Sequence, residues 1–334
     1  MNIRPSRRGR QSLTGRAPRT MRYALYAALA AGAASVIHFG ASLAILAGSP
    51  GEGPPVATHR ASGGALVICG GGRLPEQVRD RFLELAGGRD ARIVVIPTAH
   101  TDADGPNAAR SLEPWKKRQI ASLRLFHTRS RVEADDLEFT RPLAEATGVW
   151  IGGGLQAKLT QAYLGTDVER QLKALLARGG VIGGTSAGAA VMSRVMITSG
   201  RTEAMLGEGF GLLPGTVIDQ HFMKRNRMER LLGVVRQHPD LVGLGIDEQT
   251  AIVVDLGSRR ISVLGNSYVV ACVPEPPQPT SEPVMKPGDL ASARVAASTT
   301  PHVEFLKPGD EADLTALKTH PDNAVVQRID FEAL

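Results

Sequence analysis

One short stretch, Gly184-Thr185-Ser186-Ala187-Gly188, has the residue types and the spacing of a nucleophile for acyl transfer. In the G-x-S-x-G pattern a strand turns sharply into a helix and holds the serine oxygen exposed at the turn. The apolar pair Val181-Ile182 precedes the pattern as a buried strand would, and small apolar residues follow it as the start of a packed helix. Such a pattern also occurs by chance in glycine-rich loops, so the serine needs identifiable partners.

A serine hydroxyl attacks a carbonyl effectively only when a base removes its proton and an acid orients that base. Among the eight histidines, His221 has the most suitable setting, because it stands where an apolar strand runs out into polar residues. His100 and His127 also lie near predicted strand ends and are alternatives. Two acids, Asp247 and Glu248, follow a short apolar segment, and either could orient the base.

The elements that must position these residues are apolar segments alternating with amphipathic ones. We expect buried strands at 65–69, 92–97 and 148–151, and helices at 76–85 and 167–177. Continuous apolar strands that alternate with helices predict an α/β fold, in which a mostly parallel sheet is covered on both faces. Farther along, segments 251–256, 260–264 and 268–272 alternate like an antiparallel meander that closes the sheet.

Several turns fall at the carboxyl ends of the predicted parallel strands. They are Gly70 to Gly72, Thr98 to His100, Gly152 to Gly154 and the serine turn itself. Because open α/β sheets bind ligands at the carboxyl ends of their strands, we expect these turns to meet at one edge.

The N-terminal region predicts targeting rather than folding. Residues 1–22 contain seven arginines and no acid, and residues 23–51 contain no Lys, Arg, Asp or Glu over a length that can cross a bilayer. Positive residues before such a segment stay in the cytoplasm, so we expect the rest of the chain to be extracytoplasmic, either secreted or held by an N-terminal membrane anchor. Removing the seven arginine charges from the formal net charge of +6 leaves −1 for residues 23–334, which argues against a nucleic-acid-binding surface.

These features divide the chain into a leader with a hydrophobic segment (1–51), a linker (52–64), a folded domain (65–273) and a proline-rich linker with a polar tail (274–334). We expect Cys69 and Cys272 to be buried free thiols, although one disulfide is an alternative in an oxidising compartment. The sequence contains no metal-ligand cluster and no dinucleotide-binding pattern, so we expect neither a metal nor an organic cofactor.

Four motifs in this order resemble the cyanophycinases, of a serine peptidase family that also holds aspartyl dipeptidases related to peptidase E. They are IGGG followed by a glutamine, GGTSAGA, DQHF followed by RNRMERL, and GIDEQTA, and the resemblance covers residues 66–272. It implies a flavodoxin-like, three-layer α/β/α fold related to class I glutamine amidotransferase domains. The glycine run before Arg73 departs from the cyanobacterial pattern, which leaves the exact substrate open.

Carried over residue by residue, the resemblance implies Ser186 as the nucleophile, His221 as the base and Glu248 as the orienting acid. The N–H of Ala187, next to the nucleophile, is one expected donor to the developing oxyanion, and the resemblance implies Gly153 as the second.

The resemblance also implies a peptide or cyanophycin-like substrate, a poly-aspartate whose β-carboxyls carry arginine through isopeptide bonds. Guanidinium groups suit bidentate binding of its carboxylates, unless they only form a solvated basic face. We expect cleavage of the β-aspartyl-arginine isopeptide linkage; alternatives are a dipeptidase for short aspartyl or isoaspartyl peptides and a catalytically idle, peptide-binding surface protein. The sequence leaves open whether the chain forms a homodimer. The expected substrate-binding residues are Gln156, Asp219, Gln220, Arg225, Arg227 and Arg230.

Overall fold

The computed structural model describes residues 63–274, 301–319 and 327–328. The predicted leader and hydrophobic segment (1–51) and nearly all of the predicted linker lie outside these residues. None of the helices in the described part has the length and apolar character needed to cross a membrane.

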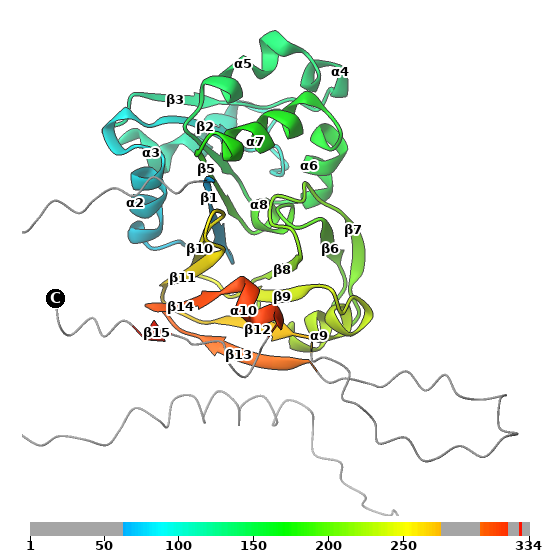
Figure 1. Cartoon of the computed structure of the whole chain (residues 1–334). Coiled ribbons are helices and arrows are strands. Elements are labelled where there is room, and N and C mark those ends of the chain that lie inside the picture. The colour runs from blue at the N-terminus through cyan, green and yellow to red at the C-terminus, as the bar shows by residue number, and fades with distance from the viewer. Residues whose placement is uncertain (1–62, 275–300, 320–326, 329–334) are drawn as a thin grey trace, which may run out of the picture. The chain divides into compact units, whose positions relative to one another are not determined.

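A nine-stranded sheet forms the centre of the fold (Figure 1). Five neighbouring strands are parallel, in the order β1 (Ala65–Cys69), β5 (Val181–Thr185), β4 (Gly148–Ile151), β2 (Arg92–Ile96) and β3 (Ser122–Leu125). On the other side of β1 the sheet continues antiparallel through β10 (Thr250–Asp255), β11 (Arg260–Gly265), β14 (Asp310–Asp313) and β15 (Gln327–Arg328).

Helices cover both faces of this sheet because successive strand residues point to opposite sides. Val67 packs in one apolar cluster with Phe82 of α2 (Glu76–Leu85) and Trp115 of α3 (Glu113–Lys116). Leu66 packs in another cluster with buried residues of α5 (Leu137–Glu145), α6 (Gln156–Tyr163), α7 (Asp167–Ala177) and α8 (Ala187–Ala190). The predicted α/β fold with helices on both faces is therefore confirmed.

A second sheet positions two of the predicted catalytic residues. Its order is β13 (His302–Leu306), β12 (Val269–Val273), β9 (Val242–Ile246) and β8 (Thr216–Gln220), and α9 (Met228–Gln237) packs on one face. β8 and β9 are parallel, so both end at the same edge, where His221 and Glu248 follow them.

The closing strands differ from the predicted meander in one respect. β10 and β11 pair as expected, but β12 pairs with β9 and β13 instead of β11. The apolar run at 269–273 marks β12 as a strand, whereas its partner depends on contacts far apart in the sequence. Cys69 and Cys272 are buried free thiols, as expected.

Residues beyond the predicted boundary at 273 contribute to both sheets. β13 completes the second sheet and β14 extends the first, and α10 (Leu314–Thr319) follows directly. Leu306, Leu314 and Leu317 are fully or almost fully buried in the main apolar cluster. The folded unit therefore extends past residue 273.

Candidate active site

The turn at Ser186 has the strained geometry of a nucleophile elbow. Ser186 lies between β5 and α8 with φ 53° and ψ −110°. A Cβ at Gly184 would lie 2.4 Å from the carbonyl oxygen of Gly188, and one at Gly188 would lie 2.2 Å from that of Ile151. Both glycines are therefore needed for the close approach of the strand and the helix.

His221 connects the serine to an acid. Its Nε2 lies 2.9 Å from Ser186 Oγ, and its Nδ1 lies 2.7 Å from Glu248 Oε1. Because a carboxylate can only accept a hydrogen bond, Nδ1–H donates to Glu248 and leaves the lone pair of Nε2 to accept the serine proton. This is the arrangement that general-base activation of a serine requires.

The surroundings of His221 favour its neutral form. Burial is the largest influence and lowers the pKa of the imidazole below its ordinary value, and the charge of Arg225 lowers it further. The hydrogen bond to Glu248 opposes this shift. The ring is therefore available as a base at neutral pH, and the Glu248 carboxylate, which already accepts its Nδ1–H, stabilises the charged form.

The glycine run after β1 gives these side chains room. A Cβ on Gly71 would lie 2.4 Å from the His221 ring, and one on Gly72 would lie 3.1 Å from Glu248 Cβ. The N–H of His221 donates to the Gly70 oxygen at 2.8 Å. The absence of side chains in this run therefore lets the imidazole pack directly against the backbone.

Asp247, the other candidate acid, is committed elsewhere. Its Oδ1 accepts a hydrogen bond from the backbone N–H of Lys224 at 2.9 Å, and its Oδ2 accepts one from the hydroxyl of Ser267 at 2.8 Å. The structure therefore brings Glu248, and not its neighbour, to the histidine.

The two expected oxyanion donors lie close to the serine. Ala187 follows Ser186 directly at the start of α8, and a Cβ on Gly153 would lie 3.4 Å from Ser186 Cβ. Within the described ranges, the N–H groups of Gly153 and Ala187 have no hydrogen-bond acceptor. This arrangement is suited to stabilising a developing negative charge.

A pocket of about 500 Å³ opens beside Ser186. Three arginines line it, and no Asp or Glu is among its described lining residues. The positive charge suits an anionic group of a substrate. The lining residues are Gly154, Leu155, Gln156, Ser186, Ile197, Thr198, Ser199, Gly200, Gln220, Arg225, Arg227 and Arg230.

The six expected substrate-binding residues have different settings. Arg225 is exposed, and the described part of the chain offers its guanidinium no partner. Arg227 Nη1 donates to the backbone oxygen of Gln220 at 2.5 Å and to its side-chain oxygen at 2.8 Å. Gln156 donates to the carbonyl oxygens of Ile197 and Thr198 at 2.9 and 2.8 Å, so it also holds the pocket wall.

Asp219 does not reach the pocket, which differs from the expectation that it contacts the arginine portion of a substrate. Its side chain is 1% exposed, and Arg230 binds both of its oxygens, with the Nε contact at 2.9 Å. Arg227 approaches the same carboxylate at 3.3 Å. Asp219 therefore holds two guanidinium groups beneath the pocket.

One wall of the pocket was missed by the sequence reasoning. It comes from β6 (Val195–Ser199), which pairs with β7 (Met205–Glu208) in a small separate sheet. The β-branched residues Val195, Ile197 and Thr198 could have indicated a strand there. Across the described ranges, no three His, Cys, Asp or Glu side chains gather as metal ligands.

Comparison with known proteins is consistent with this geometry. The model of peptidase family S51 matches residues 66–261. A cyanophycinase of Synechococcus elongatus is 33% identical over 227 residues, which cover 64% of this chain and 70% of that protein. A cyanophycinase of Trichormus variabilis is 32% identical over 240 residues, covering 68% and 79%.

A solved structure supports the fold. The crystal structure of a peptidase from an acI-B1 actinobacterium matches with a TM-score of 0.54 and 20% identity, covering 74% of this chain and 96% of that one. The family model spans more than half of the chain. The chain therefore belongs to peptidase family S51 and is a serine-type peptidase.

Proposed function

We propose that this peptidase hydrolyses bonds of aspartyl residues through an acyl-enzyme on Ser186, with His221 as base and Glu248 as orienting acid. The observation that carries the proposal is the hydrogen-bonded series from Ser186 through His221 to Glu248, which opens on an arginine-lined pocket. A serine peptidase requires a nucleophile, an oriented base and a substrate site within reach of one another.

The reaction follows from this geometry. His221 Nε2 takes the proton of Ser186 as Oγ attacks the carbonyl carbon, and the Glu248 carboxylate stabilises the resulting imidazolium. The N–H groups of Gly153 and Ala187 donate to the oxyanion. The imidazolium then gives its proton to the leaving amine, and a water molecule, activated by the same histidine, hydrolyses the acyl-enzyme.

The charge of the pocket supports recognition of a carboxylate. Among the residues that the structure describes, the Arg225 guanidinium has no partner, and Arg227 donates hydrogen bonds through Nη1 alone. A substrate guanidinium finds no carboxylate among the described lining residues. We therefore assign the pocket to the aspartyl portion of the substrate and place its arginyl portion outside.

The β-aspartyl-arginine isopeptide linkage of a cyanophycin-like polymer is the first candidate substrate, because the curated relatives named above are cyanophycinases. Short aspartyl or isoaspartyl peptides are the alternative, since they present the same carboxylate group without being part of a polymer.

Incubation of the wild-type protein and Ser186→Ala with cyanophycin, β-Asp-Arg and Asp-X dipeptides tests the proposal. Release of free arginine marks cleavage of the isopeptide bond, whereas release of β-Asp-Arg from the polymer marks cleavage of its backbone. Ser186→Ala is expected to abolish every cleavage and leave the melting temperature unchanged. Turnover by that variant, or a wild type inactive on all three substrates, would refute the assignment.

Arg225→Ala tests the carboxylate contact. We expect a loss of about 2 kcal/mol, roughly 30-fold in kcat/KM, with little recovery in Arg225→Lys because an ammonium group lacks the bidentate geometry. Arg236→Ala is the matched control, since Arg236 is exposed on α9 outside the pocket lining. Equal kinetics in Arg225→Ala and Arg236→Ala would remove Arg225 from substrate binding.

We also propose that the peptidase domain is exported. The support is the arginine-rich segment 1–22 followed by residues 23–51 without charged side chains. A reporter that is active only in the cytoplasm, when fused after residue 64, should give no signal. A signal equal to that of a fusion lacking residues 1–51 would refute export.

A further inference from the structure

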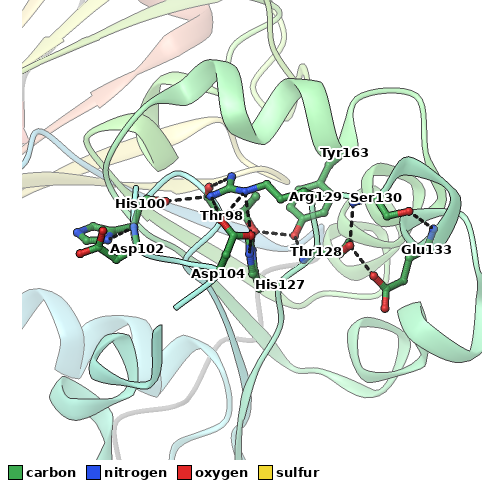
Figure 2. Close-up of polar contacts among 10 residues, drawn as sticks. All are labelled: Thr98, His100, Asp102, Asp104, His127, Thr128, Arg129, Ser130, Glu133 and Tyr163. Atoms are coloured by element: carbon green, nitrogen blue, oxygen red, sulfur yellow. Dashed lines mark hydrogen bonds and ion pairs between the residues drawn. The ribbon is translucent and has the colours of Figure 1, made fainter. Parts of the chain in front are cut away.

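A second polar network lies outside the proposed catalytic residues (Figure 2). Thr98 follows β2, and its hydroxyl is 2.8 Å from His127 Nδ1 and 2.6 Å from the hydroxyl of Tyr163. The other ring nitrogen of His127 is 2.9 Å from Asp104 Oδ1. This series has the residue types of a second catalytic triad, but Thr98 is fully buried and cannot meet a substrate. The network therefore has another role.

Arg129 binds the same segment at several points. Its guanidinium donates to the carbonyl oxygens of Thr98 at 2.5 Å and His100 at 3.1 Å, and to both carboxylate oxygens of Asp104 at 3.1 to 3.3 Å. The hydrogen bond from His127, followed by those from Arg129, holds the pKa of Asp104 below its usual range. His127 and Arg129, which follow β3, therefore hold both ends of segment 98–104 by hydrogen bonds.

Segment 98–104 packs against the glycine loop of the active site. The N–H of Leu155 donates to the Ala99 oxygen at 2.9 Å, and that of Gly152 donates to the Ile96 oxygen at the same distance. Gly154 has φ +140°, and a Cβ there would lie 2.2 Å from the Ala99 oxygen. The glycine loop thus packs against residues 96–99 on one side. On its other side Gly153 lies next to Ser186.

We propose that His127 and Arg129 are positioning residues, which act through Asp104 and residues 98–100 to hold the N–H of Gly153 at the oxyanion position. This inference rests on the proposed function of Ser186. A displaced oxyanion donor weakens binding of the transition state more than binding of the substrate, so loss of these contacts should lower kcat and leave KM nearly unchanged.

The test compares Arg129→Lys with Arg131→Lys. Arg131 is a matched control because its guanidinium also donates to two backbone oxygens, those of Gln161 and Leu164, away from the glycine loop. Lysine retains the charge but cannot make the contacts of Arg129 simultaneously. We expect kcat to fall about 10-fold or more in Arg129→Lys, with KM within about twofold, because small displacements in an active site have effects of this size. Arg131→Lys should match the wild type.

A fluorophosphonate gives a second readout that needs no aspartyl substrate. Ser186 Oγ attacks phosphorus, the phosphorus–fluorine bond breaks, and His221 takes the serine proton. The labelling rate should fall in Arg129→Lys and in His127→Gln by factors similar to the loss in kcat, while the melting temperature of Arg129→Lys stays within a few degrees of the wild type.

The outcomes separate the two proposals. A wild type that is not labelled at Ser186 would refute the serine mechanism, and this inference would fall with it. A wild type that is labelled, with Arg129→Lys and His127→Gln labelled at the same rate, would overturn the positioning role alone. A change confined to KM, or an equal loss in Arg131→Lys, would also overturn it.

Discussion

Replacing Asp219 with asparagine tests whether this carboxylate stabilises the fold or binds substrate. In the wild type, Arg230 binds both oxygens of Asp219, and the two side chains are 2% and 1% exposed. Asparagine offers one oxygen and one NH₂ group, so at least one guanidinium N–H would face another donor. The variant would therefore leave a buried positive charge without its counter-ion.

The magnitude follows from that burial. Removing one partner of a buried ion pair costs about 3–5 kcal/mol. A domain of this size loses roughly 2–4 °C in melting temperature for each kcal/mol, so Asp219→Asn should melt roughly 6–20 °C lower. Because breaking the pair also frees Arg230 beneath the pocket, we expect a loss of activity to accompany the loss of stability.

Thermal unfolding followed by circular dichroism measures the effect. Asp240→Asn is the control, because Asp240 is exposed and its neutralisation should change the melting temperature by about 2 °C or less. The double variant Asp219→Leu/Arg230→Met should recover part of the loss, since it removes both charges together. An Asp219→Asn variant as stable as the wild type, with an increase in KM only, would show that Asp219 contacts substrate and that this reasoning is wrong.

Three further predictions concern the site and the core. Glu248→Gln should lower kcat about 10³-fold or more. Because Glu248 raises the pKa of His221, the variant should also move the acidic limb of the kcat/KM profile to lower pH, and an upward move of that limb would contradict this. Burial raises the pKa of Cys272 to about 12 and that of Cys69 further, so mass spectrometry should find neither thiol alkylated by iodoacetamide until the protein is unfolded; rapid native labelling would be contrary evidence. Gly154→Ala should lower both the melting temperature and kcat, and unchanged values in calorimetry and kinetics would argue against the close contact with Ala99.

The sequence predicted the parts of the fold whose information is local. Strands 65–69 and 148–151 and helix 167–177 have the predicted bounds, because continuous apolar runs and regular helical spacing mark them. The partner of β12 was not predictable in this way, because three alternating strands can pair in more than one order.

Only the part of the candidate site that depends on local sequence was predictable in the same way. The serine turn was recognisable from five adjacent residues, the end of an apolar strand indicated His221, and the resemblance favoured Glu248 over Asp247. The role of Asp219 could not be read locally, because its neighbours in sequence do not reveal that Arg230 encloses it. The sequence offered His127 only as an alternative base near a strand end. Its contacts with Thr98 and Asp104 join segments 29 and 23 residues away, and no local spacing encodes them.

The late position of β13 and β14 has a consequence for how the chain is made. During synthesis, β11 and β12 emerge from the ribosome well before residues 302–313, which pair with their open edges. All five residues of β12 are buried in the finished fold, so the nascent chain carries an unpaired apolar strand edge until β13 has been made. Folding therefore completes only after residues 302–313 have been made, and a chain ending at residue 273 would keep both edges open to other molecules, with aggregation as the result.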